Sequence, residues 1–131
     1  MKHLVDSDWV IDFLKGRPNA RAVLESRYSE GLAISIITYA EVYEGIHYGS
    51  DPPRNEAVFR RFLQGVRIIG ISRPVARCFV ALRGLLRSRG DLIPQPDLII
   101  AATAVEHRLI WLTRNTRHCA RIPGLQLYQP V

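Results

Sequence analysis

Short apolar stretches alternate along the chain with longer segments whose apolar residues recur at helical spacing. The short stretches predict five strands, at residues 2–6, 32–35, 67–71, 109–113 and 125–128. The longer segments predict helices that start at Ser7 or Asp8, at Thr38 and at Pro74, and over residues 19–28, 55–63 and 97–107, with a short turn through His118. Strands that alternate with helices favour an α/β fold with a parallel sheet covered on both faces.

The segment at residues 94–104 has the most unusual pattern. Asp97 follows Pro96 and precedes residues that are almost all apolar or small. Proline suits the start of a helix and aspartate suits its N-cap, so Asp97 is predicted to cap a helix buried on most sides. A carboxylate at the edge of the core is costly unless a cation meets it.

Two further acids have ordinary structural explanations. Asp6 or Asp8 would cap the first predicted helix, and Thr38 with Glu41 has the spacing of a capping box. Capping alone therefore accounts for each acid taken singly, and only their joint position argues for a shared site.

The helix at residues 19–28 is expected to bury Ala22, Val23 and Leu24.

Composition narrows the class of protein. The 131 residues fit one domain, residues 1–131, of ordinary apolar content. The N-terminus has no signal-peptide form and no apolar run is long enough for a membrane span, so we expect a soluble cytoplasmic protein. Cys78 and Cys119 have no CxxC spacing, which argues against a structural zinc site.

The charge balance of the chain is basic. Net charge is +6, and all 18 basic residues except Lys2 and Lys15 are arginine. Guanidinium groups match phosphate and carboxylate geometry, so nucleic acid and an acidic protein are both candidates, and a basic surface can also serve solubility alone. The helix that begins near Pro74 is the most basic segment.

Several polar residues follow strands of the predicted sheet. Asp6 ends the first strand, Glu41 lies near the start of the helix after the second, and Asn115 follows the fourth. Parallel sheets bind ligands beyond the carboxyl ends of their strands, so these residues are expected to share one edge. Asp97 joins them only if its helix begins at that edge, which the sequence leaves open.

A cluster of three carboxylates implies a cation. Asp6, Glu41 and Asp97 would repel one another unless a hard ion, Mg²⁺ or Mn²⁺, lay between them. Water bound to such an ion attacks phosphodiesters, and arginines would hold the nucleic-acid backbone. The residues therefore predict a metal-dependent nuclease.

Five segments, in order, resemble the PIN-domain ribonucleases and in particular the VapC toxins of toxin–antitoxin pairs. They span nearly the whole chain and comprise residues 4–11 (LVDSDWVI), 35–45 (SIITYAEVYEG), 96–104 (PDLIIAATA), 113–115 (TRN) and 121–125 (RIPGL). The resemblance implies an α/β/α sandwich with a five-stranded parallel sheet in the order 3-2-1-4-5. It also implies Mg²⁺- or Mn²⁺-dependent cleavage of structured RNA such as transfer or ribosomal RNA, a homodimer, and a cognate VapB-like antitoxin.

By position in this family, Asp6, Glu41 and Asp97 would be metal ligands and Asn115 would take a fourth catalytic position. Many PIN domains carry aspartate where this chain has Asn115, and His118 stands where relatives often have an acid. The lower negative charge leaves a second metal ion in doubt, although Asp8 or, less plausibly, Asp91 would compensate. Further candidates are accessory residues (Ser7, Asp8, Thr113, His118) and RNA-phosphate contacts (Arg83, Arg87, Arg114, Arg117).

Two rival functions remain open from the sequence. Asp6 and Asp8 have the spacing of the nucleophile and acid/base pair of haloacid-dehalogenase-type phosphatases. That chemistry also requires a later lysine, and the only lysines are Lys2 and Lys15. The second rival is a catalytically inactive PIN module that binds RNA or protein.

Overall fold

A five-stranded parallel sheet forms the centre of the protein. The computed structural model describes residues 2–129, and its strands are arranged in the order β3-β2-β1-β4-β5. They are β1 (His3–Val5), β2 (Leu32–Ser35), β3 (Val66–Ile69), β4 (Ile110–Leu112) and β5 (Gln126–Leu127). Every neighbouring pair is parallel, which confirms the predicted α/β class and strand order.

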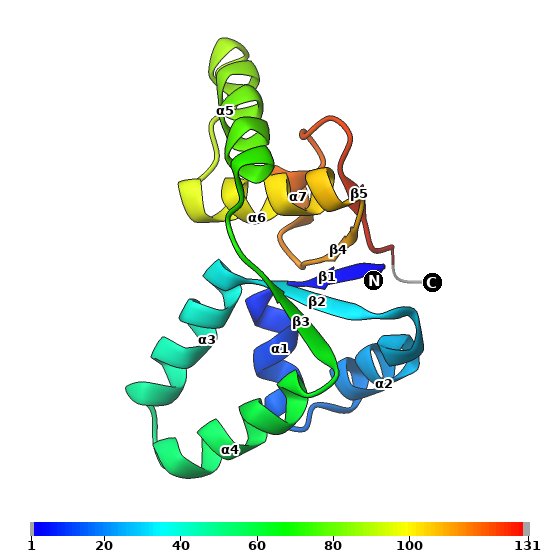
Figure 1. The fold of residues 1–131 in the computed structure, drawn as a ribbon, viewed down its shortest axis with the longest axis vertical. Helices are drawn as coiled ribbons and strands as arrows, with labels where there is room; N and C mark the ends of the chain where they lie inside the picture. Colours follow the sequence, from blue (N-terminus) through cyan, green and yellow to red (C-terminus); the bar gives the residue numbers. More distant parts are fainter. Residues whose placement is uncertain (1, 130–131) are drawn as a thin grey trace.

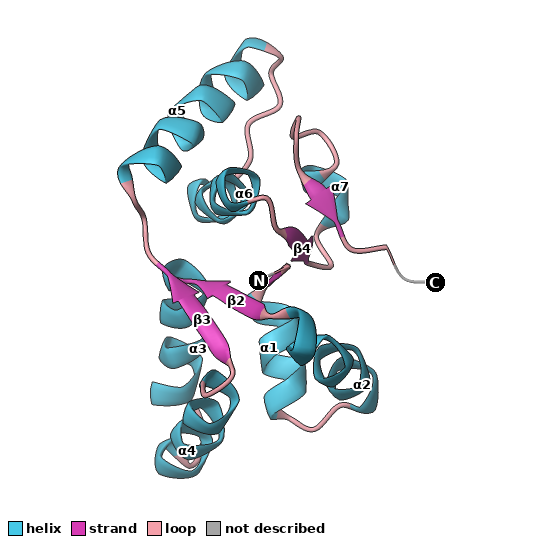
Figure 2. Ribbon diagram, turned by 45° about the vertical axis from the view of Figure 1, so that its right-hand side comes forward, coloured by secondary structure: helices cyan, strands magenta, loops and turns pink. Residues whose placement is uncertain are grey.

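Helices cover both faces of this sheet (Figures 1 and 2). One face carries α1 (Ser7–Leu14), α2 (Pro18–Arg27), α3 (Ile36–His47) and α4 (Pro52–Leu63). The opposite face carries α5 (Arg73–Ser88), α6 (Gln95–His107) and the short α7 (Thr116–Cys119), and a 3-10 turn, η1 (Tyr28–Glu30), precedes β2. Within residues 2–129, no helix combines the length and apolar character needed to cross a bilayer.

Successive residues of the three central strands, β2, β1 and β4, supply two separate cores. Leu4 and Trp111 pack with α5 and α6, whereas their neighbours Val5 and Leu112 pack with α1 to α4. Side chains alternate across a sheet, so a strand buried on both faces must be apolar throughout. This requirement explains the short uninterrupted apolar stretches of the sequence.

Helix α6 lies deep in the first of these cores. Leu98 and every residue from Ile100 to Ala104 are buried, as the apolar sequence predicted. The helix packs along α5 and against the sheet, and its N-terminal turn carries Asp97 to the edge of the core. The open question of where this helix begins is thereby answered.

The predicted capping box at Thr38 is wrong. Helix α3 begins at Ile36, and the Ser35 hydroxyl accepts a hydrogen bond from the backbone N–H of Ile37 at 3.0 Å. Thr38 is a fully buried residue of the first turn, and its hydroxyl has no partner among the described residues. Because the helix starts earlier than expected, Glu41 lies in its second turn and performs no capping.

The structure also decides the caps of α1 and α6. Of the candidates Asp6, Ser7 and Asp8, it is Asp6 that caps α1, by accepting a hydrogen bond from the Ser7 N–H at 2.9 Å. Helix α6 already starts at Gln95, so Asp97 lies inside its first turn and makes no capping hydrogen bond. Prolines allow this earlier start because their missing N–H groups need no partner.

Other boundaries differ by a few residues. Helix α4 begins at Pro52 rather than residue 55, with Asp51 as its cap. Strand β3 ends at Ile69 rather than residue 71. On α2 the inward residues are Ala20 and Leu24, and the expected Ala22 is exposed. Apolar spacing alone fixes neither the residue at which a helix or strand ends nor the face of a helix that is buried, so shifts of this size follow.

Removing the hydroxyl of Ser35, which caps α3, should destabilise the protein, whereas removing that of Thr38, the wrongly predicted cap, should not. We expect Ser35→Ala to lower the free energy of unfolding by about 1 kcal/mol, because the Ile37 N–H loses its acceptor in a buried place. Thr38→Val keeps the side-chain shape and removes an unpartnered hydroxyl, so it should be neutral or stabilising. Urea unfolding of both variants tests this, and a larger loss in Thr38→Val would contradict the observed cap.

Candidate active site at the carboxyl edge of the sheet

Asp6 is held rigidly where β1 ends. Its backbone is extended and its Oδ1 accepts the Ser7 N–H at 2.9 Å. Its Oδ2 accepts a hydrogen bond from the Thr113 hydroxyl at 2.6 Å. Parallel pairing of Val5 with Leu112 in the adjacent β4 places Thr113 beside Asp6, so the sheet register itself orients this carboxylate.

Burial makes the Asp6 charge costly. It raises the pKa of Asp6 from 3.8 to about 6, although the hydrogen bonds from Thr113 and Ser7 act in the opposite direction. The nearby charges of Asp8 and Asp97 raise the pKa of Asp6 further. A cation at this carboxylate would remove the penalty.

Asp97 acts electrostatically on the other two acids. Burial raises its pKa, and the charge of His118 lowers it. The pKa of Glu41 is raised by burial first and by the charge of Asp97 second, with the Ser7 side chain acting in the opposite direction. Asp97 therefore interacts electrostatically with both Asp6 and Glu41, as the predicted shared edge requires.

The three acids suit a hard cation in chemistry, although their side chains do not converge on one point. Within residues 2–129, no three His, Cys, Asp or Glu side chains come close enough together to coordinate a single ion. All the donors are carboxylate oxygens of the kind that Mg²⁺ and Mn²⁺ prefer, and their like charges repel one another unless a cation neutralises them. The residues at this edge thus fit a divalent ion by donor type and by mutual repulsion.

Thr113 and Asn115 connect β4 to this edge. The Asn115 N–H donates to the Thr113 hydroxyl at 3.2 Å, and that hydroxyl in turn donates to Asp6. Asn115 is exposed at the start of α7, and its side chain makes no capping hydrogen bond. Its amide is therefore available to a ligand near Asp6.

Asp8 and His118 play different parts. Asp8 accepts hydrogen bonds from the backbone N–H groups of Trp9 at 2.7 Å and Arg114 at 3.1 Å, so it joins α1 to the loop after β4. His118 lies near enough to Asp97 to lower its pKa, and the buried Nδ1 of His118 has no partner among the described residues. His118 is thus half-buried and close enough to Asp97 to act on its charge.

The four candidate arginines have different environments. The Arg114 guanidinium pairs with Asp12 at 2.5 Å and lies over the Trp9 ring at 4.7 Å from its centroid. Arg83 lies against Gln95. When the carboxamide oxygen of Gln95 faces Arg83, it accepts hydrogen bonds from the Arg83 guanidinium at 2.9 and 3.2 Å. Arg87 and Arg117 are exposed.

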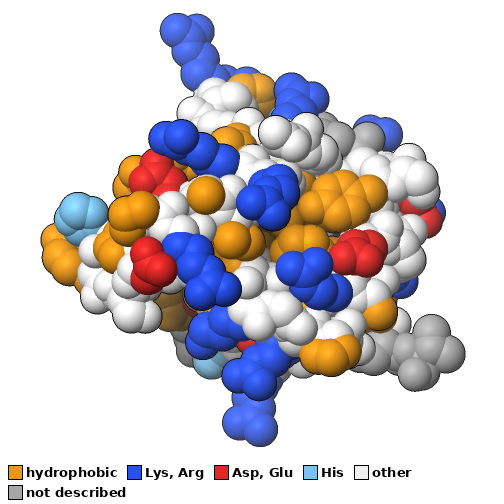
Figure 3. Space-filling model, turned by 90° about the horizontal axis from the view of Figure 1, so that it is seen from below, with side chains coloured by type: hydrophobic (Ala, Val, Ile, Leu, Met, Phe, Trp, Pro, Cys, Tyr) orange, Lys and Arg blue, Asp and Glu red, His pale blue; other side chains and the backbone are white. Residues whose placement is uncertain are grey.

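Basic side chains are not confined to the acidic edge. Figure 3 looks onto the end of the molecule away from α5, where Lys and Arg side chains separate patches of exposed apolar side chains. Arg54, Arg60 and Arg61 of α4 are all exposed, as predicted. Net charge by itself therefore does not mark the path of a nucleic acid.

Sequence patterns missed two residues near the acids. Asp12 has no motif and acquires its role only when α1 packs beside the loop that carries Arg114. Cys119 is a buried free thiol whose pKa is raised to about 12 by burial and by the charges of Asp6, Asp97 and Asp8. It stays protonated and packs in the core.

Asp91, which the sequence offered as a less plausible compensating acid for a second metal ion, pairs with Arg121 at 3.3 Å.

Comparison with known proteins gives a consistent family. A family model described as "PIN domain" matches residues 3–125. "Ribonuclease VapC2" of Haemophilus influenzae is 32% identical over 129 residues, 96% of each chain. The "tRNA(fMet)-specific endonuclease VapC" of Salmonella typhimurium is 26% identical over 127 residues, 97% of this chain and 96% of the relative.

A solved structure agrees with these sequence matches. The "Toxin-antitoxin complex from Klebsiella pneumoniae" contains a chain that superposes with a TM-score of 0.76 at 36% identity, covering 99% of this chain and 98% of that one. The similarity therefore extends over the whole sheet and all the elements that carry the acids.

We expect the buried charge of Asp6 to weaken the metal-free fold above pH 6. The folded state holds the proton of Asp6 more tightly than the unfolded state does, since the pKa rises from 3.8 to about 6. Its stabilising contribution is therefore complete below pH 3.8 and is lost as the pH rises through about 6. In chelator, Asp6→Asn should melt about 3 to 6 °C above wild type at pH 7.5 and much less so at pH 4.5.

Glu25→Gln provides the control, because Glu25 is exposed and, among residues 2–129, pairs only with Arg21 on the same helix. It should show no such pH-dependent gain. Thermal unfolding followed by circular dichroism measures both variants. A gain for Asp6→Asn that is equal at the two pH values would show that its charge carries no penalty.

Proposed function

The chain belongs to the PIN-domain family, and on that premise we propose that it is a toxin endoribonuclease that cuts structured RNA with the aid of a divalent metal ion. The main support for this proposal is the position of Asp97, whose charge acts on both Asp6 and Glu41 at the carboxyl edge of the sheet. Similarity to the VapC ribonucleases supports the reaction class. We propose that residues 1–131 act as one domain.

Asp6, Glu41 and Asp97 would hold Mg²⁺ or Mn²⁺ through their carboxylate oxygens. Such an ion, when bound, supplies an activated water and neutralises charge on the phosphate being cut. We propose one tightly held ion, because Asn115 adds an oxygen donor but no negative charge. The remaining work of the site falls to the chain's own groups.

Thr113 and the Ser7 N–H fix the direction of the Asp6 carboxylate through one hydrogen bond to each oxygen. A carboxylate held at both oxygens loses little freedom when it binds a ligand, which favours binding. Asn115 and His118 extend the site along α7, and Arg83, Arg87, Arg114 and Arg117 offer guanidinium groups to the RNA backbone. We propose that the phosphodiester to be cut binds between the acids and these arginines.

We propose an antitoxin as the protein partner. The Klebsiella pneumoniae structure is a toxin–antitoxin complex, and the likeness covers nearly the whole of both chains. A chain of net charge +6 also favours an acidic partner. By family resemblance the toxin would form a homodimer within a VapB-like heterocomplex, and it would act in the cytoplasm, where transfer RNA is found.

The family match bears on the two rival functions that the sequence left open. The family match leaves the haloacid-dehalogenase alternative without support, since that class is not the PIN domain. An inactive PIN module remains the competing proposal, and only a test of cleavage separates it from an enzyme.

Purified protein, freed of antitoxin, should cleave a total transfer-RNA pool with Mg²⁺ or Mn²⁺ and not with chelator. Asp97→Asn should reduce cleavage by about 100-fold or more, because it removes the acid that links the other two. Thr103→Val serves as a control on the same helix, since the Thr103 hydroxyl donates to the Ile99 carbonyl and to no other group in the described part of the chain. Cleavage that survives chelation, or that is unaffected by Asp97→Asn, contradicts the proposal.

Arg87 tests the basic path. If it contacts an RNA phosphate, Arg87→Gln should weaken RNA binding at every sequence and reduce the slope of log K against log salt by about 0.7 to 0.9. Arg61→Gln removes an exposed charge from α4, on the other face of the sheet, and should leave the slope unchanged. Fluorescence anisotropy of a labelled transfer RNA in chelator measures both. Equal slopes in wild type and Arg87→Gln would remove Arg87 from the RNA path.

A further inference from the structure

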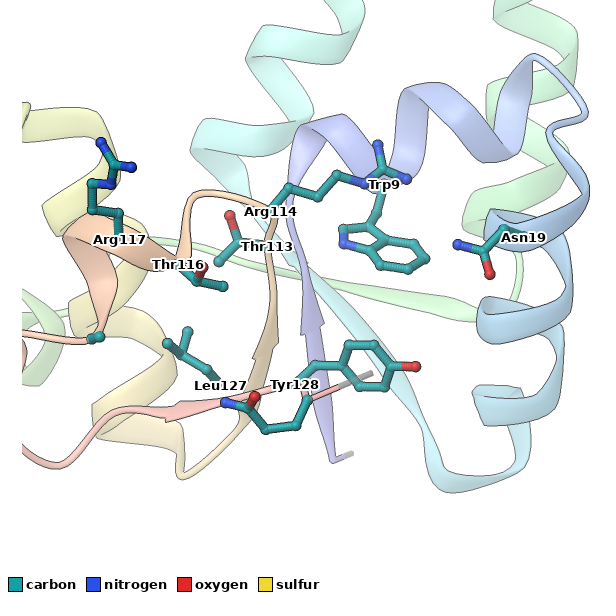
Figure 4. A pocket seen from close by; sticks show the side chains of 10 residues that line it. Trp9, Asn19, Thr113, Arg114, Thr116, Arg117, Leu127 and Tyr128 are labelled. Atoms are coloured by element: carbon teal, nitrogen blue, oxygen red, sulfur yellow. The ribbon is translucent and has the colours of Figure 1, made fainter. Parts of the chain in front are cut away.

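A pocket of about 690 Å³ adjoins the acidic site, and the proposed chemistry leaves it unused. It lies between the start of α1, the loop after β4, α7 and the end of β5 (Figure 4). Thr113 lines this pocket and also donates its hydroxyl proton to Asp6. One side chain therefore separates the pocket from the carboxylates.

Two aromatic rings form its walls. Trp9 and Tyr128 meet edge to face, with ring centroids 5.9 Å apart and planes at 86°. Arg114 covers the Trp9 ring and Arg27 covers the Tyr128 ring, at 4.7 and 4.9 Å from the centroids. The guanidinium groups over the two rings help to hold them in place, so the rings form a rigid apolar wall of the pocket.

The Trp9 indole carries an unsatisfied donor into this pocket. The side chain is only 5% exposed, and its Nε1–H has no hydrogen-bond partner among residues 2–129. Figure 4 shows the indole nitrogen on the side of the ring that faces Thr113 and Thr116. A buried donor without an acceptor is unfavourable, so the pocket suits a ligand that brings an acceptor.

The rim of the pocket supplies a positive charge. Arg114 is engaged by Asp12, whereas Arg117 is exposed and forms no ion pair with the residues that the structure describes. A guanidinium free of carboxylates at a pocket mouth suits a phosphate group. The pocket thus combines an aromatic wall, a buried donor and a cation.

We propose that this pocket is a nucleotide subsite that holds one unstacked base of the RNA next to the phosphodiester to be cut. The base accepts a hydrogen bond from Trp9 Nε1–H, and its phosphate contacts Arg117. This inference rests on the proposed function, because the RNA substrate brings the base. An indole N–H only donates and every base has an acceptor, so the contact holds an unstacked base without choosing its identity.

The indole N–H signal of Trp9 tests this directly by nitrogen–proton NMR in chelator. Wild type has two indole signals, from Trp9 and the buried Trp111, and Trp9→Phe assigns them by removing one. Titration with the four nucleoside 5′-monophosphates should move the Trp9 signal and leave that of Trp111 in place. Ribose 5-phosphate, which has the phosphate but no base, should leave both signals in place.

Variants at the rim separate the pocket from general charge effects. Arg117→Gln should weaken nucleotide binding roughly fivefold, as expected for one exposed charged contact, and Arg61→Gln should not change it. Both positions are exposed, so the variants should fold; matching melting temperatures check this. Equal affinities in Arg117→Gln and Arg61→Gln would overturn the phosphate contact.

The outcomes distinguish this inference from the proposed function. A Trp9 signal that moves with nucleotides, in a protein that cleaves no RNA, would support the subsite and contradict the endoribonuclease. A Trp9 signal that stays fixed, in a protein that cleaves RNA, would overturn the subsite alone. A signal that moves only with the antitoxin would overturn the inference as well, because the pocket would then bind protein.

Discussion

The burial of α6 is the constraint on which the rest of the structure depends. Its residues from Ile100 to Ala104 are enclosed by α5 and the sheet, so the helix has no face on which it could rotate or slide. Its first turn therefore projects Asp97 at a fixed place beyond the carboxyl ends of β1 and β4. The repulsion among Asp97, Asp6 and Glu41 follows from this packing and cannot relax by movement of the helix.

Such an arrangement weakens the fold in order to prepare a site. Burial raises the pKa of all three acids, which means that ionising them at neutral pH costs stability. The Thr113 hydroxyl offsets part of the cost at Asp6, and it does so because strand register places β4 beside β1. A bound cation would convert the remaining repulsion into attraction, so that metal affinity and stability are coupled.

The loop after β4 connects chemistry with recognition. Thr113 bonds to Asp6, the Arg114 N–H bonds to Asp8, and both residues line the pocket beside Trp9. A base held in that pocket would lie next to the acids, because the same short segment forms both. Contacts to phosphates position an RNA, whereas a base held out of its stack selects which bond reaches the site.

The sequence by itself determined the strands, the buried character of α6 and the acids of one edge, because apolar periodicity and strand-end positions are local properties. Resemblance to a known family supplied the order of the strands. It did not determine the caps: Ser35 rather than Thr38 caps α3, and Asp6 was one of several candidates for α1, since several polar residues compete and only backbone geometry chooses among them. Tertiary structure alone decided the Asp12–Arg114 pair, the position of Cys119 and the pocket around Trp9. These features join segments about 100 residues apart, and no local pattern records which side chains the sheet will bring together.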